Sequence, residues 1–160
     1  MTTTNPLEQR QFVGLLIGLL ALGILLLIGS LPGSPLRSGN LELVVIFSLP
    51  LLIALITYLR FAPSAIWWEI VLLGIWGIFG LAVAAFIGFL LTMDATGGYP
   101  GARIELLQDI TRFVAMTVGV GLPYGLAGMF REEKPRIAVL SVLLAPIALI
   151  ILVSVTSSLL

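Results

Sequence analysis

Residues 70–93 read IVLLGIWGIFGLAVAAFIGFLLTM, a run of 24 residues without a charged side chain. A helix of about 20 mostly apolar residues crosses the roughly 30 Å hydrocarbon core of a bilayer. The run lacks the alternation of polar and apolar residues that marks a strand of a transmembrane barrel. Because lipid offers no hydrogen-bond partner to an open backbone, we expect a membrane-spanning helix here, beginning near residue 66.

Four other apolar segments accompany this run. The five expected spans cover residues 12–31, 43–59, 66–93, 113–130 and 137–160. The span 43–59 is the shortest, so a re-entrant or tilted element is the alternative there. Apolar residues at helical spacing, with no Gly or Pro before Phe113, predict a helical extension of the fourth span from about residue 103. The sequence therefore predicts a single integral membrane domain over residues 1–160, an all-α, polytopic transmembrane bundle with five spanning helices.

The composition excludes several kinds of chemistry. The chain is 59% hydrophobic and 10% charged, has no net charge, and contains neither Cys nor His. The chain therefore cannot form disulfides or zinc sites of Cys and His. It also cannot form a Cys–His or Ser–His–Asp catalytic site. Scattered basic residues argue against nucleic acid, and no nucleotide-binding or catalytic motif is present. We expect no enzyme activity, no cofactor and no metal.

The basic residues predict an orientation. With five spans, five basic residues fall on the side of the N-terminus: Arg10, Arg60, Arg131, Lys134 and Arg136. Three fall on the other side: Arg37, Arg103 and Arg112. Cytoplasmic loops carry the excess of Lys and Arg. We therefore expect a multi-pass protein of the cell membrane with a cytoplasmic N-terminus and the C-terminus on the opposite side.

Every charged residue lies at or near the end of an expected span. Charge inside a membrane is costly and usually functional, so its absence from mid-span positions argues against an ion-coupled transporter. Glu69 is the nearest exception, about one turn into the third span. We expect the positive N-terminal end of the helix dipole to stabilise its negative charge. We also expect Glu69 to pair with Arg60 across the short link between the second and third spans. The alternative is a contact with an ion or a partner.

Proline occurs near the middle of three spans, at Pro50, Pro123 and Pro146. Each proline removes a helical hydrogen bond, and the freed carbonyl is able to line a cavity or bind an ion. The fourth span is the richest in such residues: Thr117, Gly119, Gly121, Pro123, Tyr124 and Gly125. It predicts either a kinked, closely packed helix or a broken helix with Thr117 and Tyr124 in a polar pocket.

Small residues also recur at four-residue spacing, as Gly14/Gly18, Gly80/Ala84/Gly88 and Gly121/Gly125. Such positions let helix backbones approach one another in lipid. They predict packing within the bundle or a face for another subunit.

These observations favour a non-catalytic membrane subunit or an accessory or assembly protein. The alternative is a small oligomeric transporter or channel whose kinked second, fourth and fifth helices line the path. The expected partners are the lipid bilayer and a membrane protein or further copies of this chain.

Overall fold

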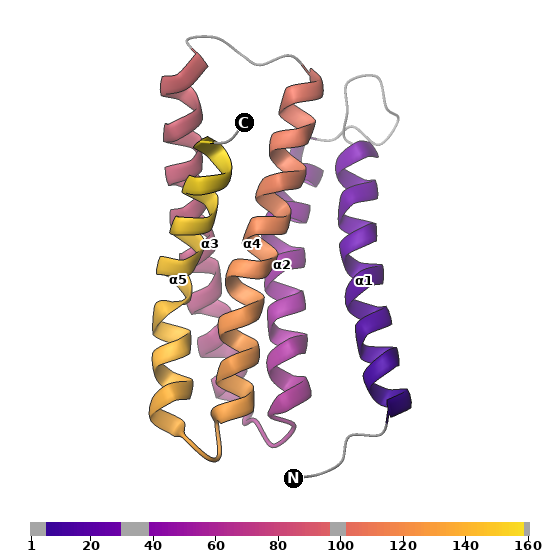
Figure 1. Ribbon diagram of the computed structural model, residues 1–160, viewed down its shortest axis with the longest axis vertical. Coiled ribbons are helices and arrows are strands. Elements are labelled where there is room, and N and C mark those ends of the chain that lie inside the picture. Colours follow the sequence, from indigo (N-terminus) through magenta and orange to yellow (C-terminus); the bar gives the residue numbers. More distant parts are fainter. Residues whose placement is uncertain (1–5, 30–38, 97–101, 159–160) are drawn as a thin grey trace.

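Five long helices make up the part of the chain that the structure, a computed structural model, describes: residues 6–29, 39–96 and 102–158 (Figure 1). The helices are α1 (Pro6–Gly29), α2 (Gly39–Phe61), α3 (Trp67–Thr96), α4 (Ala102–Phe130) and α5 (Pro135–Ser158). No strand occurs in these ranges. The all-α bundle predicted from the sequence is therefore confirmed.

The helices run alternately up and down, so the α2–α3 and α4–α5 links lie at the same end of the bundle (Figure 1). The order around the bundle differs from the order in the sequence. α4 packs between α2 and α5, and α3 packs mainly on α5, with a smaller contact to α2. α1 lies outside this group, against α2 and α4.

α4 is the central helix because its sequence suits burial among other helices. It is the least hydrophobic of the four longest apolar helices, and 56% of its apolar stretch is buried, against 11% for α1. Its small side chains let neighbours come close. Phe113, Met116, Val120 and Tyr124 follow one another at helical spacing and are fully buried along the bundle axis.

Four of the five helices are long and apolar enough to cross a membrane: α1, α3, α4 and α5. The described apolar part of α2, Val45–Phe61, is shorter, so its full span stays a prediction. The predicted extension of the fourth span is confirmed, since α4 is continuous from Ala102. α1 begins at Pro6, earlier than predicted, because proline is well suited to the first position of a helix. The predicted ends at residues 31 and 160 lie outside the described residues.

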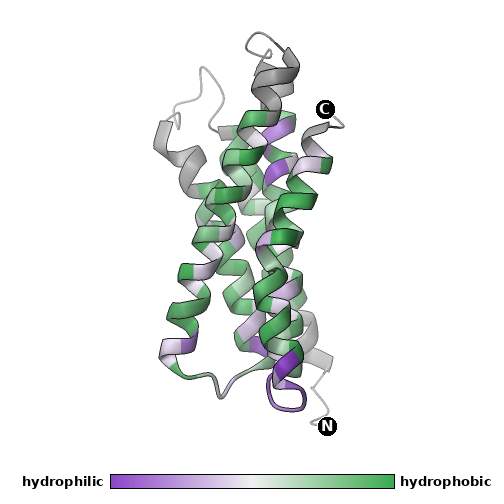
Figure 2. Cartoon of the chain, turned by 90° about the vertical axis from the view of Figure 1, so that its left-hand side faces the viewer, coloured by the Kyte–Doolittle hydropathy of each residue, from purple (hydrophilic) through white to green (hydrophobic). Residues whose placement is uncertain are grey.

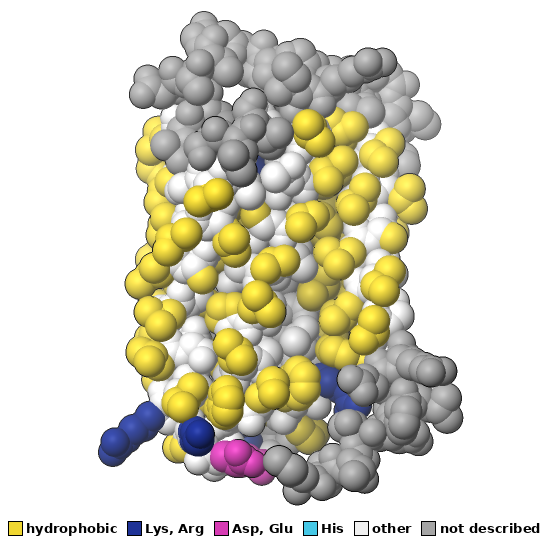
Figure 3. All heavy atoms as spheres, in the orientation of Figure 1, with side chains coloured by type: hydrophobic (Ala, Val, Ile, Leu, Met, Phe, Trp, Pro, Cys, Tyr) yellow, Lys and Arg dark blue, Asp and Glu magenta, His cyan; other side chains and the backbone are white. Residues whose placement is uncertain are grey.

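The outer surface of the described bundle matches a bilayer. Hydrophobic residues cover the middle of the helices, and the link between α4 and α5 is hydrophilic (Figure 2). In Figure 3 hydrophobic side chains cover the flank, while acidic and basic side chains gather at the lower end. This distribution is compatible with a membrane protein.

Candidate functional site

The three mid-helix prolines lie inside continuous helices. Pro50, Pro123 and Pro146 interrupt neither α2, α4 nor α5. The broken fourth helix is therefore wrong, and the continuous α4 agrees with the alternative of a closely packed helix, whose kink at Pro123 stays a prediction. Pro50 and Pro146 are buried among neighbouring helices, so they do not line an open path through the described bundle.

The carbonyl freed by Pro146 has a partner on another helix. Pro146 lacks the N–H that would bond the carbonyl of Val142, four residues earlier. The indole Nε1–H of Trp76 on α3 donates to this carbonyl oxygen at 2.9 Å. The freed group is thus used to join α3 to α5. Trp76 was not predicted, because nothing in the sequence shows that α3 packs beside Pro146 of α5.

The two hydroxyls predicted to form a polar pocket bind backbone carbonyls instead. Thr117 Oγ1 donates to the carbonyl of Phe113 at 2.8 Å, within α4. The Tyr124 hydroxyl donates to the carbonyl of Leu73 on α3 at 2.6 Å. Tyr124 is fully buried, so it closes the centre of the bundle rather than lining a passage.

Several of the predicted small residues do let helices approach. A Cβ built on Gly80 would lie 3.3 Å from Leu149 Cδ1 and 3.3 Å from Pro146 Cγ, and one built on Gly119 would lie 2.9 Å from Leu149 Cδ2. Leu149 of α5 therefore fits between glycines of α3 and α4. A Cβ built on Gly125 would lie 3.1 Å from Thr57 Cγ2 of α2, so α2 and α4 also approach closely there. Ala84 and Gly88 of α3 are buried.

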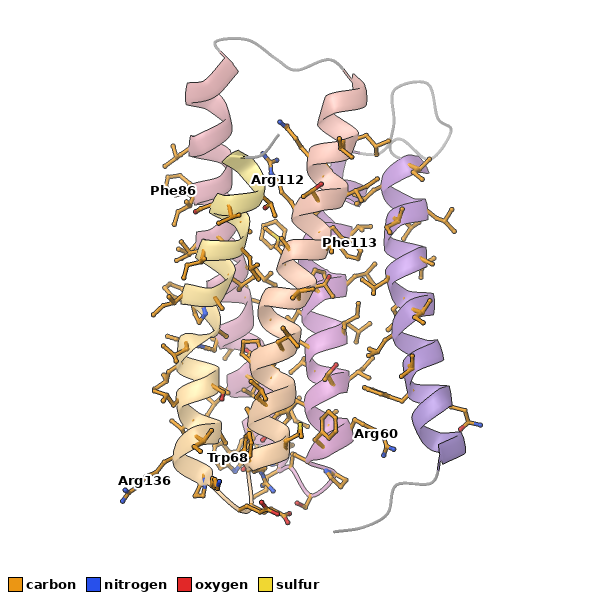
Figure 4. The ribbon with its side chains drawn as sticks, viewed as in Figure 1. Arg60, Trp68, Phe86, Arg112, Phe113 and Arg136 are labelled. Atoms are coloured by element: carbon orange, nitrogen blue, oxygen red, sulfur yellow. The ribbon has the colours of Figure 1, made fainter. Side chains whose placement is uncertain are left out.

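Three further glycines with this role were missed. Gly23 receives the ring of Phe113, Gly77 receives Leu51 and Tyr124, and Gly128 lies against the backbone of Tyr58. Figure 4 shows Phe113 reaching from α4 toward α1. Gly77 lies three residues from Gly74 and from Gly80, and Gly128 lies three residues after Gly125. A spacing of four residues therefore did not include them.

Other predicted small residues face open space. A Cβ at Gly14, Gly18 or Gly121 would have no described neighbour within 4 Å. The packing of Gly14 and Gly18 within the bundle is therefore wrong. Gly14 lies nine residues before Gly23, and Gly18 lies nine residues before Leu27. Nine residues are two and a half turns of an α-helix, so the two members of each pair lie on opposite sides of α1. Gly23 and Leu27 are buried, so Gly14 and Gly18 face directly away from the bundle.

The acid of the predicted interface pair has a different partner. Glu69 forms a two-pronged ion pair with Arg131 of the α4–α5 link, with Nη2 to Oε1 at 3.0 Å and Nε to Oε2 at 3.1 Å. The predicted partner, Arg60, instead places its guanidinium 5.9 Å from the ring centroid of Phe12 on α1. The sequence placed Glu69 correctly at an end but could not show which link lay opposite.

Arg131 joins the two links at this end of the bundle. Its Nη1 donates to Ser64 Oγ at 2.9 Å, and Ser64 donates to Glu132 Oε1 at 3.1 Å. The Tyr58 hydroxyl completes the cluster with a 3.4 Å bond to Glu69 Oε2. The hydrogen bonds with Glu69 raise the pKa of Arg131 above its ordinary value, so the guanidinium stays charged.

A groove of about 460 Å³ begins at this cluster and runs between α3 and α5. Trp68 and Leu72 line one wall, and Ala138, Val139 and Val142 line the other. Tyr58, Glu69 and Arg131 contribute its polar end. The groove thus has apolar walls and a charged end, and it lies where α3 and α5 begin. Trp68 marks this end of the bundle in Figure 4.

In the described ranges no three acidic, His or Cys side chains are grouped so that they could hold a metal ion. Asp109 Oδ1 lies 3.7 Å from Arg112 Nη1, three residues later in α4. No protein-family model, curated protein or solved structure matches this chain. Its function therefore has to be argued from the side chains themselves.

Proposed function

We propose that this chain is a non-catalytic subunit or accessory protein of a membrane assembly, and that a helix of a partner protein packs on α1. The observation that carries the proposal is the pair of open glycines on α1. Gly14 and Gly18 have no described neighbour within 4 Å. By contrast, Gly23 on the opposite side of the same helix is filled by Phe113.

A glycine within a helix is unfavourable by roughly 1 kcal/mol relative to alanine, and in lipid it contributes almost no apolar contact. Two such residues one turn apart are useful where another backbone comes close. α1 has the least buried apolar stretch of the four longest apolar helices, so it offers the room that such a contact needs.

A transporter or channel within one chain is less well supported. The hydroxyls of Thr117 and Tyr124 bind backbone carbonyls, and the freed carbonyl of Val142 is bonded by Trp76. Large side chains fill the axis of the bundle. A path would have to form between several chains, as in the oligomeric form of that alternative.

The proposal places the protein in the cell membrane, with five spans and a cytoplasmic N-terminus. Arg60 and Arg136 lie at one end of the bundle and Arg112 toward the other (Figure 4). Lys134 and Arg131 belong to the same end as Arg136, and an excess of basic residues favours the cytoplasm. A reporter fused after Leu160 should therefore be active only on the non-cytoplasmic side; cytoplasmic activity would contradict the orientation or the five spans.

The subunit proposal is tested by isolating the tagged full chain in mild detergent and identifying bound membrane proteins by mass spectrometry. We expect a stoichiometric partner that is lost from the double variant Gly14→Leu, Gly18→Leu. Gly74→Leu on α3 is the matched control, because a Cβ there also has no neighbour within 4 Å. The control should keep the partner.

Two results would count against the proposal. A stable species of this chain alone would favour the oligomeric transporter or a solitary role. A partner that is lost equally from the Gly74 control would show that the α1 face is not the contact.

A further inference from the structure

The groove between α3 and α5 has a shape and a chemistry that the subunit proposal does not use. It is a hollow on the membrane-facing flank of the bundle, and it begins at the charged cluster. We propose that it binds one acyl chain of an anionic phospholipid, with the phosphate of the headgroup over Arg136. This proposal is independent of any partner on α1.

The length of the groove suits an acyl chain. Its α5 wall runs from Pro135 to Leu143, which is about 12 Å at the rise of an α-helix. One leaflet of hydrocarbon is roughly 15 Å deep. The groove therefore extends over most of the depth of one leaflet, as an acyl chain does.

The walls favour the same occupant. Leu72, Ala138, Val139 and Val142 present hydrocarbon to the groove. An extended peptide would leave its backbone N–H and C=O groups without partners at this depth, which is costly. A lipid chain has no such groups, and it enters from the bilayer without crossing water.

The charged end favours a negatively charged headgroup. α3 and α5 both begin here, so two positive helix ends flank the opening. Arg136 is exposed and lines a second hollow that shares Val139 and Leu143 with the groove. Three acids lie at this end as well: Glu69 is paired with Arg131, Glu132 accepts a hydrogen bond from Ser64, and Glu133 is exposed in the α4–α5 link. Charged hydrogen bonds from Arg to phosphate are among the stronger ones in proteins.

Native mass spectrometry of the full chain tests the proposal. The protein is purified in nonionic detergent and incubated with equal amounts of phosphatidylglycerol and phosphatidylcholine of the same chain length. We expect one bound lipid per chain, with the anionic lipid retained about tenfold better, as one charged hydrogen bond predicts.

Two matched pairs of variants separate the chain from the headgroup. Val139→Phe narrows the groove and should reduce retention of both lipids several-fold. Val71→Phe places the same change on an exposed position of α3 that does not line the groove, and it should leave retention unchanged. Arg136→Gln should bring the anionic lipid down to the level of the neutral one, whereas Arg60→Gln, at the same end but facing α1, should not.

Three outcomes would overturn the proposal. The first is the absence of any retained lipid from the native chain. The second is an equal loss from Val71→Phe and Val139→Phe, which would mean non-specific coating. The third is equal retention of the two lipids by the native chain, which would remove the role of Arg136. Each can occur whether or not a partner binds α1.

Discussion

Replacing Trp76 by phenylalanine should cost less stability in a chain that also carries Pro146→Ala than in the native chain. In the native chain the Val142 carbonyl accepts from the Trp76 indole at 2.9 Å, and Pro146 has no N–H to offer it. Trp76→Phe therefore leaves this carbonyl without its donor. Alanine at position 146 supplies a backbone N–H to the Val142 carbonyl. In that background Trp76→Phe therefore removes mostly the packing contacts of the indole ring.

The size of the effect follows from the environment of the bond. Hydrogen bonds between helices in membranes average about 0.6 kcal/mol and reach about 1.7 kcal/mol. An unsatisfied buried carbonyl costs about 1–3 kcal/mol. We expect Trp76→Phe to reduce the free energy of unfolding by about 1–2 kcal/mol, including lost contact with Phe79, whose ring centroid lies 5.5 Å away. About 1 kcal/mol of this loss should disappear in the Pro146→Ala background.

The assay is a double-mutant cycle in mixed detergent–SDS micelles. Unfolding is followed by energy transfer between dyes on cysteines introduced at Pro63 and Glu133, on the two adjoining links. The chain contains no native cysteine that would take up dye. Trp68→Phe, eight residues earlier in α3, is the control, and its cost should not depend on residue 146. Additivity of Trp76→Phe and Pro146→Ala within about 0.3 kcal/mol would refute the reasoning.

Two further predictions concern packing and charge. Gly80→Leu should destabilise the bundle by about 1–3 kcal/mol, because a Cβ there already lies 3.3 Å from Leu149 Cδ1; the same thermal or SDS titration should show no such loss for Gly74→Leu. Glu69→Gln should lower the free energy of unfolding by less than about 1 kcal/mol, because both partners of the pair with Arg131 are partly exposed. This loss should shrink in high salt, and a loss that is independent of salt would contradict a role through charge.

The sequence was enough to predict the helices but not their neighbours. Long uncharged runs and the short links indicated the number, direction and approximate limits of the helices. Nothing in those patterns indicates that α3 packs mainly on α5, although α2 precedes it in the chain. Apolar helices look alike from every side, since lipid and a neighbouring helix both accept Leu and Ile.

The candidate site shows the same limit. The sequence placed Glu69 at a membrane boundary because charge is excluded from mid-span positions. It assigned Arg60 as the partner because that residue is near in sequence, whereas Arg131 is near in space. Pro146 was correctly identified as freeing a carbonyl, but the donor, Trp76, lies on another helix. A pattern within one helix does not show which side chain of a neighbouring helix will donate a hydrogen bond to the freed carbonyl.

The pairing of α3 with α5 has a consequence for biosynthesis. A ribosome delivers α3 to the membrane well before α5, and between these events the side of α3 that carries Trp76 and Gly80 has no final neighbour. The indole then lacks its acceptor until Val142 and Pro146 follow in α5. Assembly of this bundle is therefore completed only after translation of its C-terminal segment, and a chain cut before residue 135 would present an unmatched helix surface to the membrane's quality-control proteases.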